Sequence, residues 1–325
     1  MRFFYNESTD APYNLALEEL IASRCEDEVI MLWRNRSAVI VGRNQNTAAE
    51  VDDDFVKAND IQVVRRMTGG GAVYHDLGNI NYTICANDRQ LEPEAFARNA
   101  QVVLAALREL GIAAEFSGRN DIVVGGRKIS GSAKSILGNR TLFHGTLLFS
   151  ADMTVLTKVL TPDPEKIRAK GIKSVRSRVA NIQEFLPQMN VEEFIAALSN
   201  KLITLSGAEF SPVPEALKTE ALELAAAKYR SWQWNYGSIT EYSFTRSRRF
   251  SCGSCRVSFN VANNCIADLA ITGDFFGQED VSLLAAQLNG ISLEPELLAA
   301  AIKKIPVEKF IHGVTHEEFI SLFGL

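Results

Sequence analysis

The sequence predicts an α+β protein with one large domain and one small domain. Two observations support this class. Along the first two thirds of the 325 residues, segments with helical periodicity alternate irregularly with short runs of branched apolar residues. At residues 232–237 the pattern changes, and short strand-like runs are then followed by helix-like segments. We therefore predict domains at residues 1–245 and 246–325.

The first predicted elements are a helix and two strands. The helix covers residues 10–24, because Asp10 can cap its N-terminus, Pro12 fits its first turn and apolar residues recur at helical spacing. Short runs of branched and aromatic residues predict strands at 29–33 and 38–41.

A glycine-rich segment follows, between further helices and strands. A helix at 48–58 and a strand at 61–64 precede the sequence RRMTGGGAVYHD at 65–76. After it come a strand at 79–85 and a helix at 94–110, which Gly111 closes. The glycines thus lie in the turn between two strands.

A hairpin is predicted in the middle of the chain. Its strands cover 121–124 and 127–133 and are joined by a Gly125-Gly126 turn. A further strand at 141–149 can pair with it. The remaining helices are predicted at 152–160, 191–206, 214–229, 279–289, 294–303 and 315–323.

Composition narrows the class of protein. The chain is 46% apolar and 22% charged, which is ordinary for a globular protein. Its formal net charge of −5 gives no reason to expect a nucleic acid or an anionic membrane as partner. The N-terminal segment has the polar residues Asn6 and Glu7 where a secretory signal would need an apolar run, and no run of about 18 apolar residues occurs. We therefore expect a cytoplasmic protein.

The five cysteines are scattered, which fits reduced thiols better than a disulfide framework. Only Cys252 and Cys255 have the spacing of a metal or redox pair. A zinc site usually needs a second pair of ligands, and the neighbouring sequence offers none. The sequence therefore does not identify metal ligands.

The Gly-Gly-Gly turn at 69–71 can bring backbone N–H groups against the oxygens of a ligand. Alternatively, the three glycines form a flexible turn that binds no ligand. Two arginines at 65–66 and a His-Asp pair at 75–76 favour the binding of phosphate or carboxylate. Tyr74 stands where a GxGxxG motif needs its third glycine, and no GxxxxGK[ST] motif occurs, so the sequence argues against a Rossmann or P-loop site.

Two further segments carry candidate cations. Lys128 lies on a predicted strand just before the small residues SGSA at 130–133, which leave room for a ligand. A single lysine is usually a surface charge, but within a sheet it needs an anionic partner. Lys170 belongs to the basic segment 169–178, whose glycine and serines suit either a loop that closes over phosphates or an exposed solvated loop.

Several separated motifs together resemble the lipoate–protein ligases. The most specific are RRMTGGGAVYHDLGN at 65–79, SGRND at 117–121 and RKISGSA at 127–133. The resemblance runs in order along nearly the whole chain and also includes WRN at 33–35, GRNQN at 42–46, FHGTLL at 143–148, AKGIKSVRSRV at 169–179 and WQWNYG at 232–237.

This resemblance implies a large α+β catalytic domain with biotin-ligase-like architecture, mixed sheets and flanking helices, followed by a small α+β accessory domain. It implies that lipoate and Mg-ATP, with Mg²⁺ as the metal ion, give lipoyl-AMP and pyrophosphate. The lipoyl group then passes to a lysine of a carrier. The carriers implied are apo lipoyl domains of 2-oxoacid dehydrogenase E2 subunits and the glycine-cleavage H protein.

The resemblance also implies roles for individual residues. Lys128 is the expected catalytic residue and contacts both ATP and the lipoyl carbonyl. The remaining ATP contacts implied are Arg66, Gly71, Ala72, Val73 and Tyr74. Further substrate-binding candidates, without an individual role, are Gly70, His75, Asp76, Asn79, Asn120, Asp121, His144 and Lys170.

Three alternatives remain open on sequence alone. An octanoyl-protein transferase of the same superfamily uses a cysteine nucleophile, but no cysteine lies between Asp121 and Phe149, and Cys85 falls in an apolar strand. A biotin ligase would carry an arginine-rich GRGRxxR loop, which is missing. A non-catalytic lipoate-binding scaffold would not need to keep Lys128 and both arginines.

Overall fold

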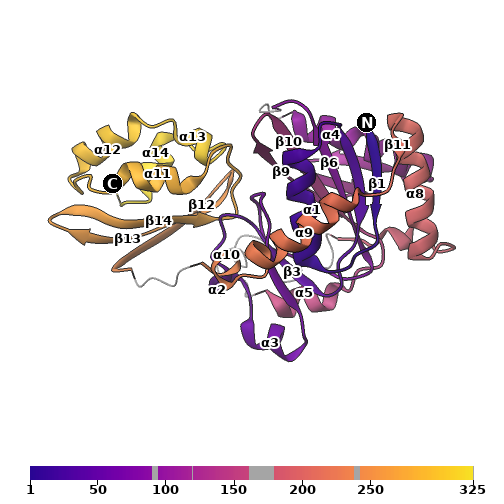
Figure 1. Cartoon of the computed structure of the whole chain (residues 1–325). Coiled ribbons are helices and arrows are strands. Elements are labelled where there is room, and N and C mark those ends of the chain that lie inside the picture. The colour runs from indigo at the N-terminus through magenta and orange to yellow at the C-terminus, as the bar shows by residue number, and fades with distance from the viewer. Residues whose placement is uncertain (90–93, 119, 161–178, 238–241, 325) are drawn as a thin grey trace.

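The computed structural model shows two units that follow each other along the chain (Figure 1). The described residues are 1–89, 94–118, 120–160, 179–237 and 242–324. The smaller unit begins with strand β12 (Phe244–Phe250). The boundary at residue 245 stays a prediction, because residues 238–241 lie outside the described part of the chain.

The larger unit is built on an eight-stranded sheet. Strand β1 pairs in parallel with both of its neighbours, and the other pairs are antiparallel, so the sheet is mixed. From edge to edge its strands are β11 (Glu209–Phe210), β1 (Arg2–Asn6), β2 (Val29–Trp33), β6 (Asn79–Ala86), β10 (Arg140–Leu148), β9 (Arg127–Leu137), β8 (Asp121–Val124) and β7 (Ala114–Ser117).

Helices cover both faces of this sheet, which explains why every residue of the central strands β2 and β6 is buried. Helices α4 (Ala95–Glu109) and α8 (Val191–Ser206) share one apolar core with one face. On the other face lie α1 (Ala11–Arg24), α9 (Glu215–Leu224), a π-helical turn (Ala225–Tyr229) and α10 (Trp232–Asn235). No helix among the described residues is long and apolar enough to cross a bilayer.

A second, three-stranded sheet holds the glycine-rich segment. Its strands, in spatial order, are β4 (Gln62–Arg65), β3 (Ala38–Val41) and β5 (Val73–His75). Near it lie the short helices α2 (Thr47–Glu50), α3 (Asp53–Ala58) and α5 (Met153–Val159), followed by the 3₁₀ turn Ile182–Glu184.

The helix predicted at 48–58 is wrong as a single element. Val51 leaves the helix to form a β-bridge with Leu160, and Asp52 then caps α3 by accepting the N–H of Phe55 at 2.9 Å. A side chain that caps a new helix competes with helix continuation at the same position. The chain therefore forms two short helices there.

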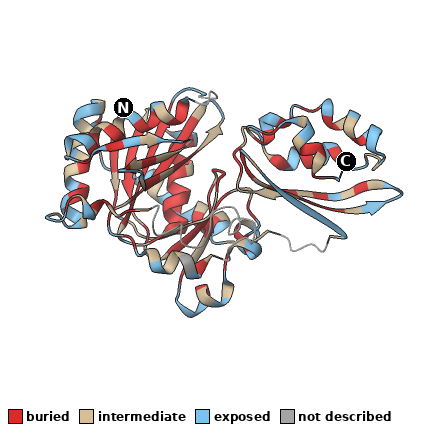
Figure 2. Cartoon of the chain, turned by 180° about the vertical axis from the view of Figure 1, so that it is seen from behind, coloured by how far each residue is buried: buried red, intermediate tan, exposed pale blue. Residues whose placement is uncertain are grey.

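The smaller unit packs helices on one face of a three-stranded antiparallel sheet (Figures 1 and 2). Strands β13 (Gly253–Ala262) and β14 (Cys265–Gly273) follow β12. Its helices are α11 (Val281–Leu288), α12 (Pro295–Lys303), α13 (Val307–Phe310) and α14 (His316–Ser321). Cys252 and Cys255 are buried thiols in its apolar core, and the described residues contain no group of three side chains suited to a metal ion.

The smaller unit touches the glycine-rich segment directly. The N–H of Gly70 donates to the carbonyl oxygen of Phe275 at 3.3 Å, and Arg43 forms an ion pair with Asp280 at 2.7 Å. The ring of Phe276 is buried in the core of the larger unit, 5.6 Å from that of Phe96. A segment of the smaller unit therefore contributes to the surroundings of the glycine loop.

Candidate active site

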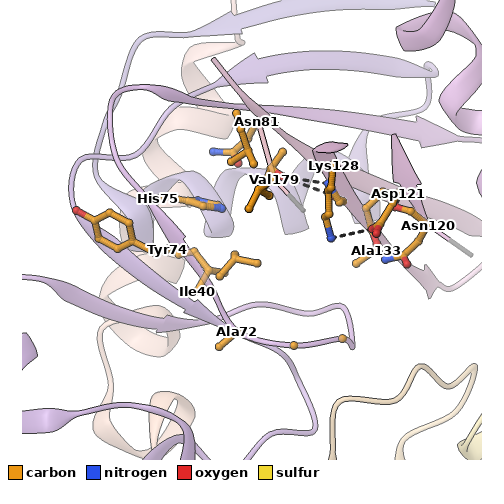
Figure 3. Close-up of a pocket in the computed structure, with 18 of the residues that line it drawn as sticks. Ile40, Ala72, Tyr74, His75, Asn81, Asn120, Asp121, Lys128, Ala133 and Val179 are labelled. Carbon is orange, nitrogen blue, oxygen red and sulfur yellow. Dashed lines mark hydrogen bonds and ion pairs between the residues drawn. The ribbon is translucent and has the colours of Figure 1, made fainter. Parts of the chain in front are cut away.

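A cavity of about 700 Å³ lies between the two sheets of the larger unit (Figure 3). This volume is in the range of pockets that hold a small organic molecule. Its inner end is lined by side chains that are at most 2% exposed, namely Leu15, Trp33 and Ile40. Lys128 and Asp121 line it as well, and their side chains are 39% and 36% exposed. The cavity therefore has an apolar floor and a charged mouth.

The pleat of the large sheet decides which residues face this cavity. Along β6, alternate residues point to the same face, so Asn81 and Thr83 lie on the cavity side while Tyr82 points to the opposite core. The cross-strand neighbours of Asn81 are Trp33 on β2 and Thr146 on β10. Both neighbours line the cavity with it.

The glycine loop is shaped by two close approaches. Gly70 has φ of 89°, a conformation that favours glycine. A β-carbon on Gly69 would lie 2.5 Å from the carbonyl oxygen of Phe275, and one on Gly42 would collide with the carbonyl of Gly70. At Gly71, by contrast, a β-carbon would meet nothing within 4 Å. Gly71 therefore borders open space in the cavity.

Arg65 binds the loop at residues 42–47 and the segment around Asn235 rather than facing the cavity. Its guanidinium donates to backbone carbonyls, including those of Gly42 at 2.9 Å and Gln45 at 2.6 Å, and to the hydroxyl of Thr47 at 2.7 Å. Burial lowers its pKa to about 10, so it stays charged at neutral pH. The side chain holds three chain segments together.

Arg66 lines the cavity but is also largely occupied by the protein. It donates to the carbonyls of Gly69 at 2.6 Å and Gly71 at 2.9 Å, and its Nε donates to Thr68 Oγ1 at 2.9 Å. Burial lowers its pKa to about 10. Arg66 thus holds the glycine loop in shape, and its predicted contact with ATP stays a prediction.

Lys128 forms an ion pair with Asp121 across the hairpin, with Nζ 2.7 Å from Oδ1. Its ammonium lies over Gly131, where a β-carbon would be only 2.8 Å from Nζ. The anionic partner that a lysine needs in this position is therefore supplied by the protein itself. Because both side chains are more than one third exposed, a ligand can compete for the lysine at little energetic cost.

A buried polar network links the loop to helix α1. His144 Nε2 lies 2.9 Å from Thr68 Oγ1, and His144 Nδ1 lies 2.9 Å from both oxygens of Glu18. Thr83 donates to Glu18 at 2.6 Å and accepts from the indole N–H of Trp33 at 2.8 Å. Sequence reasoning missed Glu18 and Thr83, because a glutamate on a helix or a threonine in a strand gives no signal until its partners are known.

The structure brings most of the predicted site residues together and leaves others apart. Asn120, Asp121, Lys128 and His144 line the cavity, as do the residues from Gly70 to His75. Asp76 instead accepts the N–H groups of Gly78 at 2.9 Å and Asp152 at 2.7 Å, which fixes a turn, and Asn79 lies outside the lining. Lys170 lies outside the described residues.

Two family models match the chain in sequence. The model of the lipoyl protein ligase A/B catalytic domain matches residues 10–203, and that of the bacterial lipoate protein ligase C-terminus matches residues 240–323. The chain belongs to the lipoate–protein ligase family. It is a ligase, and the fold class predicted from its sequence is confirmed.

Relatives of this ligase match along its whole length. It is 38% identical to lipoate-protein ligase LplJ of Bacillus subtilis, over 99% of both chains. It is also 38% identical to lipoate–protein ligase 1 of Staphylococcus aureus, over 100% of both chains. Agreement over the full length covers both units, including the C-terminal one.

Solved structures agree with the fold. The structure of LipL1 from P. falciparum in complex with lipoate has a TM-score of 0.81 at 25% identity and covers 98% of this chain and 97% of its own. A lipoate-protein ligase A bound with ATP has a TM-score of 0.63 at 29% identity, covering 73% of this chain and 99% of its own. A bipartite ligase from Thermoplasma acidophilum, described with its E2 lipoyl domain, has a TM-score of 0.66 at 31% identity, covering 75% and 98%.

Proposed function

We propose that this ligase activates lipoate with ATP and transfers the lipoyl group to a lysine of a carrier protein. One observation carries the proposal. The Lys128–Asp121 pair lies at the mouth of a deep apolar cavity, beside the glycine loop. An apolar tail suits the buried floor, and a carboxylate suits the cationic mouth.

In the first half-reaction, a carboxylate oxygen of lipoate attacks the α-phosphorus of ATP. A bond forms between that oxygen and phosphorus, and pyrophosphate leaves. The lipoate carboxylate and the α-phosphate are both negatively charged. Lys128 stabilises this charge once its ammonium leaves Asp121 and binds their oxygens. Gly71 borders open space and is positioned to let the phosphates approach the backbone.

In the second half-reaction, the neutral ε-amine of the carrier lysine attacks the acyl carbonyl of lipoyl-AMP. An amide bond forms, the acyl–phosphate bond breaks, AMP leaves and the amine loses a proton. Lys128 can polarise the carbonyl because it lies at the mouth, where an incoming amine arrives. The mouth of the cavity therefore has to admit both ATP and the carrier protein.

A magnesium ion and the carriers belong to the same proposal. Magnesium usually binds through substrate phosphates together with one or two carboxylates, and Asp121 is a half-exposed carboxylate beside Lys128. This donor set fits Mg²⁺ that arrives with ATP. The carriers we propose are apo lipoyl domains of 2-oxoacid dehydrogenase E2 subunits and the glycine-cleavage H protein. A cytoplasmic location is also part of the proposal.

The test is acylation of an apo lipoyl domain, followed by mass spectrometry of the intact carrier. With ATP, Mg²⁺ and lipoate we expect the carrier to gain one lipoyl group, and without ATP no gain. A gain from octanoyl carrier protein without ATP would instead identify an octanoyl transferase. Binding of lipoate without turnover would identify a scaffold.

A further inference from the structure

The position of the proton on the His75 ring is fixed by a chain of side-chain amides. Asn14 Nδ2 lies 2.9 Å from the backbone carbonyls of Ser8 and Arg34, so this atom must be the donor nitrogen. The same nitrogen lies 2.8 Å from Asn35 Oδ1, so its two hydrogens are shared among three acceptors. The reverse orientation of Asn35 would set two NH₂ groups against each other. Asn35 therefore presents its Nδ2 to His75 Nδ1 at 3.1 Å.

His75 Nδ1 consequently accepts a hydrogen bond and carries no proton. In the neutral ring the proton then lies on Nε2. Burial, together with the nearby charges of Arg66 and His144, lowers the pKa of His75 to about 3. The ring is therefore neutral at physiological pH, with an N–H donor at Nε2.

This donor lies at the floor of the cavity and has no partner among the described residues. His75 is 4% exposed and lines the cavity, and its ring meets that of Trp33 edge to face at 6.5 Å. In Figure 3 His75 and Asn81 lie together, across the cavity from Lys128 and Asp121. A buried N–H without an acceptor costs free energy, which a ligand atom at this place would recover.

We infer that His75 Nε2–H is a specificity-determining donor for a sulfur atom at the distal end of the acyl substrate. The inference rests on the proposed function. With the carboxylate of lipoate held at Lys128, its five-membered dithiolane ring extends toward the apolar floor. A ring sulfur is large, polarisable and a weak acceptor, so it satisfies both the apolar walls and the single donor.

The same argument predicts which acids bind poorly. A plain saturated chain or a carbocycle fills the apolar space but leaves the His75 N–H without an acceptor. The loss is that of one weak hydrogen bond, so we expect about a three- to tenfold preference for the sulfur ring. Size does not account for such a preference if the competing acid has the same shape.

The test compares lipoate with 5-cyclopentylpentanoate, in which carbon replaces both sulfurs of the ring. The measured quantity is kcat/KM for acid-dependent exchange of pyrophosphate into ATP. In His75→Asn the shorter amide keeps an acceptor near Asn35 but removes the donor at the Nε2 position. In His75→Gln the longer amide restores a donor there.

The result is the ratio of kcat/KM for lipoate to kcat/KM for the carbon analogue. We expect the wild type to prefer lipoate and His75→Asn to have a ratio close to one. His75→Gln should recover most of the preference. Turnover of the carbon analogue and the thermal unfolding temperature show whether each variant has kept its fold. An unchanged ratio in a folded His75→Asn variant would overturn the inference. Absence of exchange with either acid in the wild type would instead overturn the proposed function.

A second measurement needs no substitution. The chain has four histidines, so ¹⁵N-histidine labelling gives a spectrum that single variants can assign. Adding lipoate should shift the Nε2 resonance of His75 and its proton, whereas the carbon analogue should leave both near their free values. Equal shifts with both acids would show that the ring responds only to filling of the cavity.

Discussion

The glycine loop and the Lys128 hairpin face each other across one cavity, yet they hold their positive charges in opposite ways. Arg65 and Arg66 are buried and donate to backbone carbonyls of the protein. Lys128 is 39% exposed and has one carboxylate partner, Asp121. The comparison teaches that the arginines build the site, whereas the lysine is free to change partners during the reaction.

The largest effect that we predict comes from Lys128→Ala. Removing one charge that stabilises the transition state typically lowers a rate by about 10²–10³. We therefore expect a loss of that size in pyrophosphate exchange, with an unchanged unfolding temperature because the side chain is half-exposed. Lys201→Ala is the matched control, since Lys201 forms an ion pair with Glu109 at 2.9 Å with similar exposure but does not line the cavity. Equal activity of the two variants would remove Lys128 from the reaction.

Arg66→Lys should have the next largest effect. An ammonium cannot reproduce the paired contacts to the carbonyls of Gly69 and Gly71, so the loop should lose its shape and ATP use should fall by about ten- to a hundredfold. Arg65→Lys is the comparison. We expect it to lower the free energy of unfolding by about 2–4 kcal/mol and to leave the KM for ATP unchanged, because Arg65 does not line the cavity. An unchanged KM for ATP in both variants would contradict the division of roles.

Gly131→Ala should act more weakly on the hairpin. Its β-carbon would come 2.8 Å from Lys128 Nζ, and the flexible lysine would move away from Asp121. We expect kcat to fall by about three- to tenfold, since a displaced charge loses part of its effect. Gly138→Ala is the comparison, because Gly138 lies in open space in the turn that joins β9 to β10, where its φ of 59° makes a side chain strained without touching Lys128. A larger loss in Gly138→Ala would show that hairpin conformation, rather than lysine position, controls turnover.

The last predicted effect is on stability in acid and leaves turnover aside. The pKa of His75 is near 3 in the folded protein, whereas an unfolded histidine has a pKa of about 6.5. Between these values the unfolded chain binds the extra proton, so folding becomes less favourable as the pH falls, by up to about 1.4 kcal/mol per pH unit. The free energy of unfolding, measured with denaturant, should therefore fall more steeply from pH 6 to pH 5 for the wild type than for His75→Gln. Parallel slopes would mean that His75 is not buried as a neutral ring.

The sequence predicted the parts of the site that lie close together along the chain. The hairpin with Lys128 depends on local turn chemistry, and the structure has it. The glycine turn also lies between two strands, but the second is the short β5, which was not predicted, and the strand predicted at 79–85 follows as β6. The partner of Lys128 was not foreseen, although Asp121 was itself a candidate. That pairing depends on strand register, since Asp121 lies opposite Gly131.

Other parts depend on contacts between distant segments and could not be predicted. Glu18 reaches His144 across 126 positions of sequence, and Arg65 reaches Asn235 across 170. The edge strands β7 and β11 and the neighbouring strand β1 were missed because they are short and gain stability from partners elsewhere in the chain. Apolar periodicity reveals which faces are buried, but it does not reveal which polar groups meet inside.

The side-chain amides of Asn14 and Asn35 determine which nitrogen of the buried His75 ring carries the proton. Each amide can turn over by 180°, which exchanges donor for acceptor without changing shape. The NH₂ of Asn14, fixed by two backbone carbonyls, keeps Asn35 from turning over. If Asn35 did turn over, its oxygen would face His75 and the ring proton would move from Nε2 to Nδ1. The floor of the cavity would then offer a lone pair where it now offers a hydrogen. The orientation of one buried amide thus decides whether the pocket prefers acids whose tail ends in an acceptor or acids whose tail ends in a donor such as a hydroxyl group.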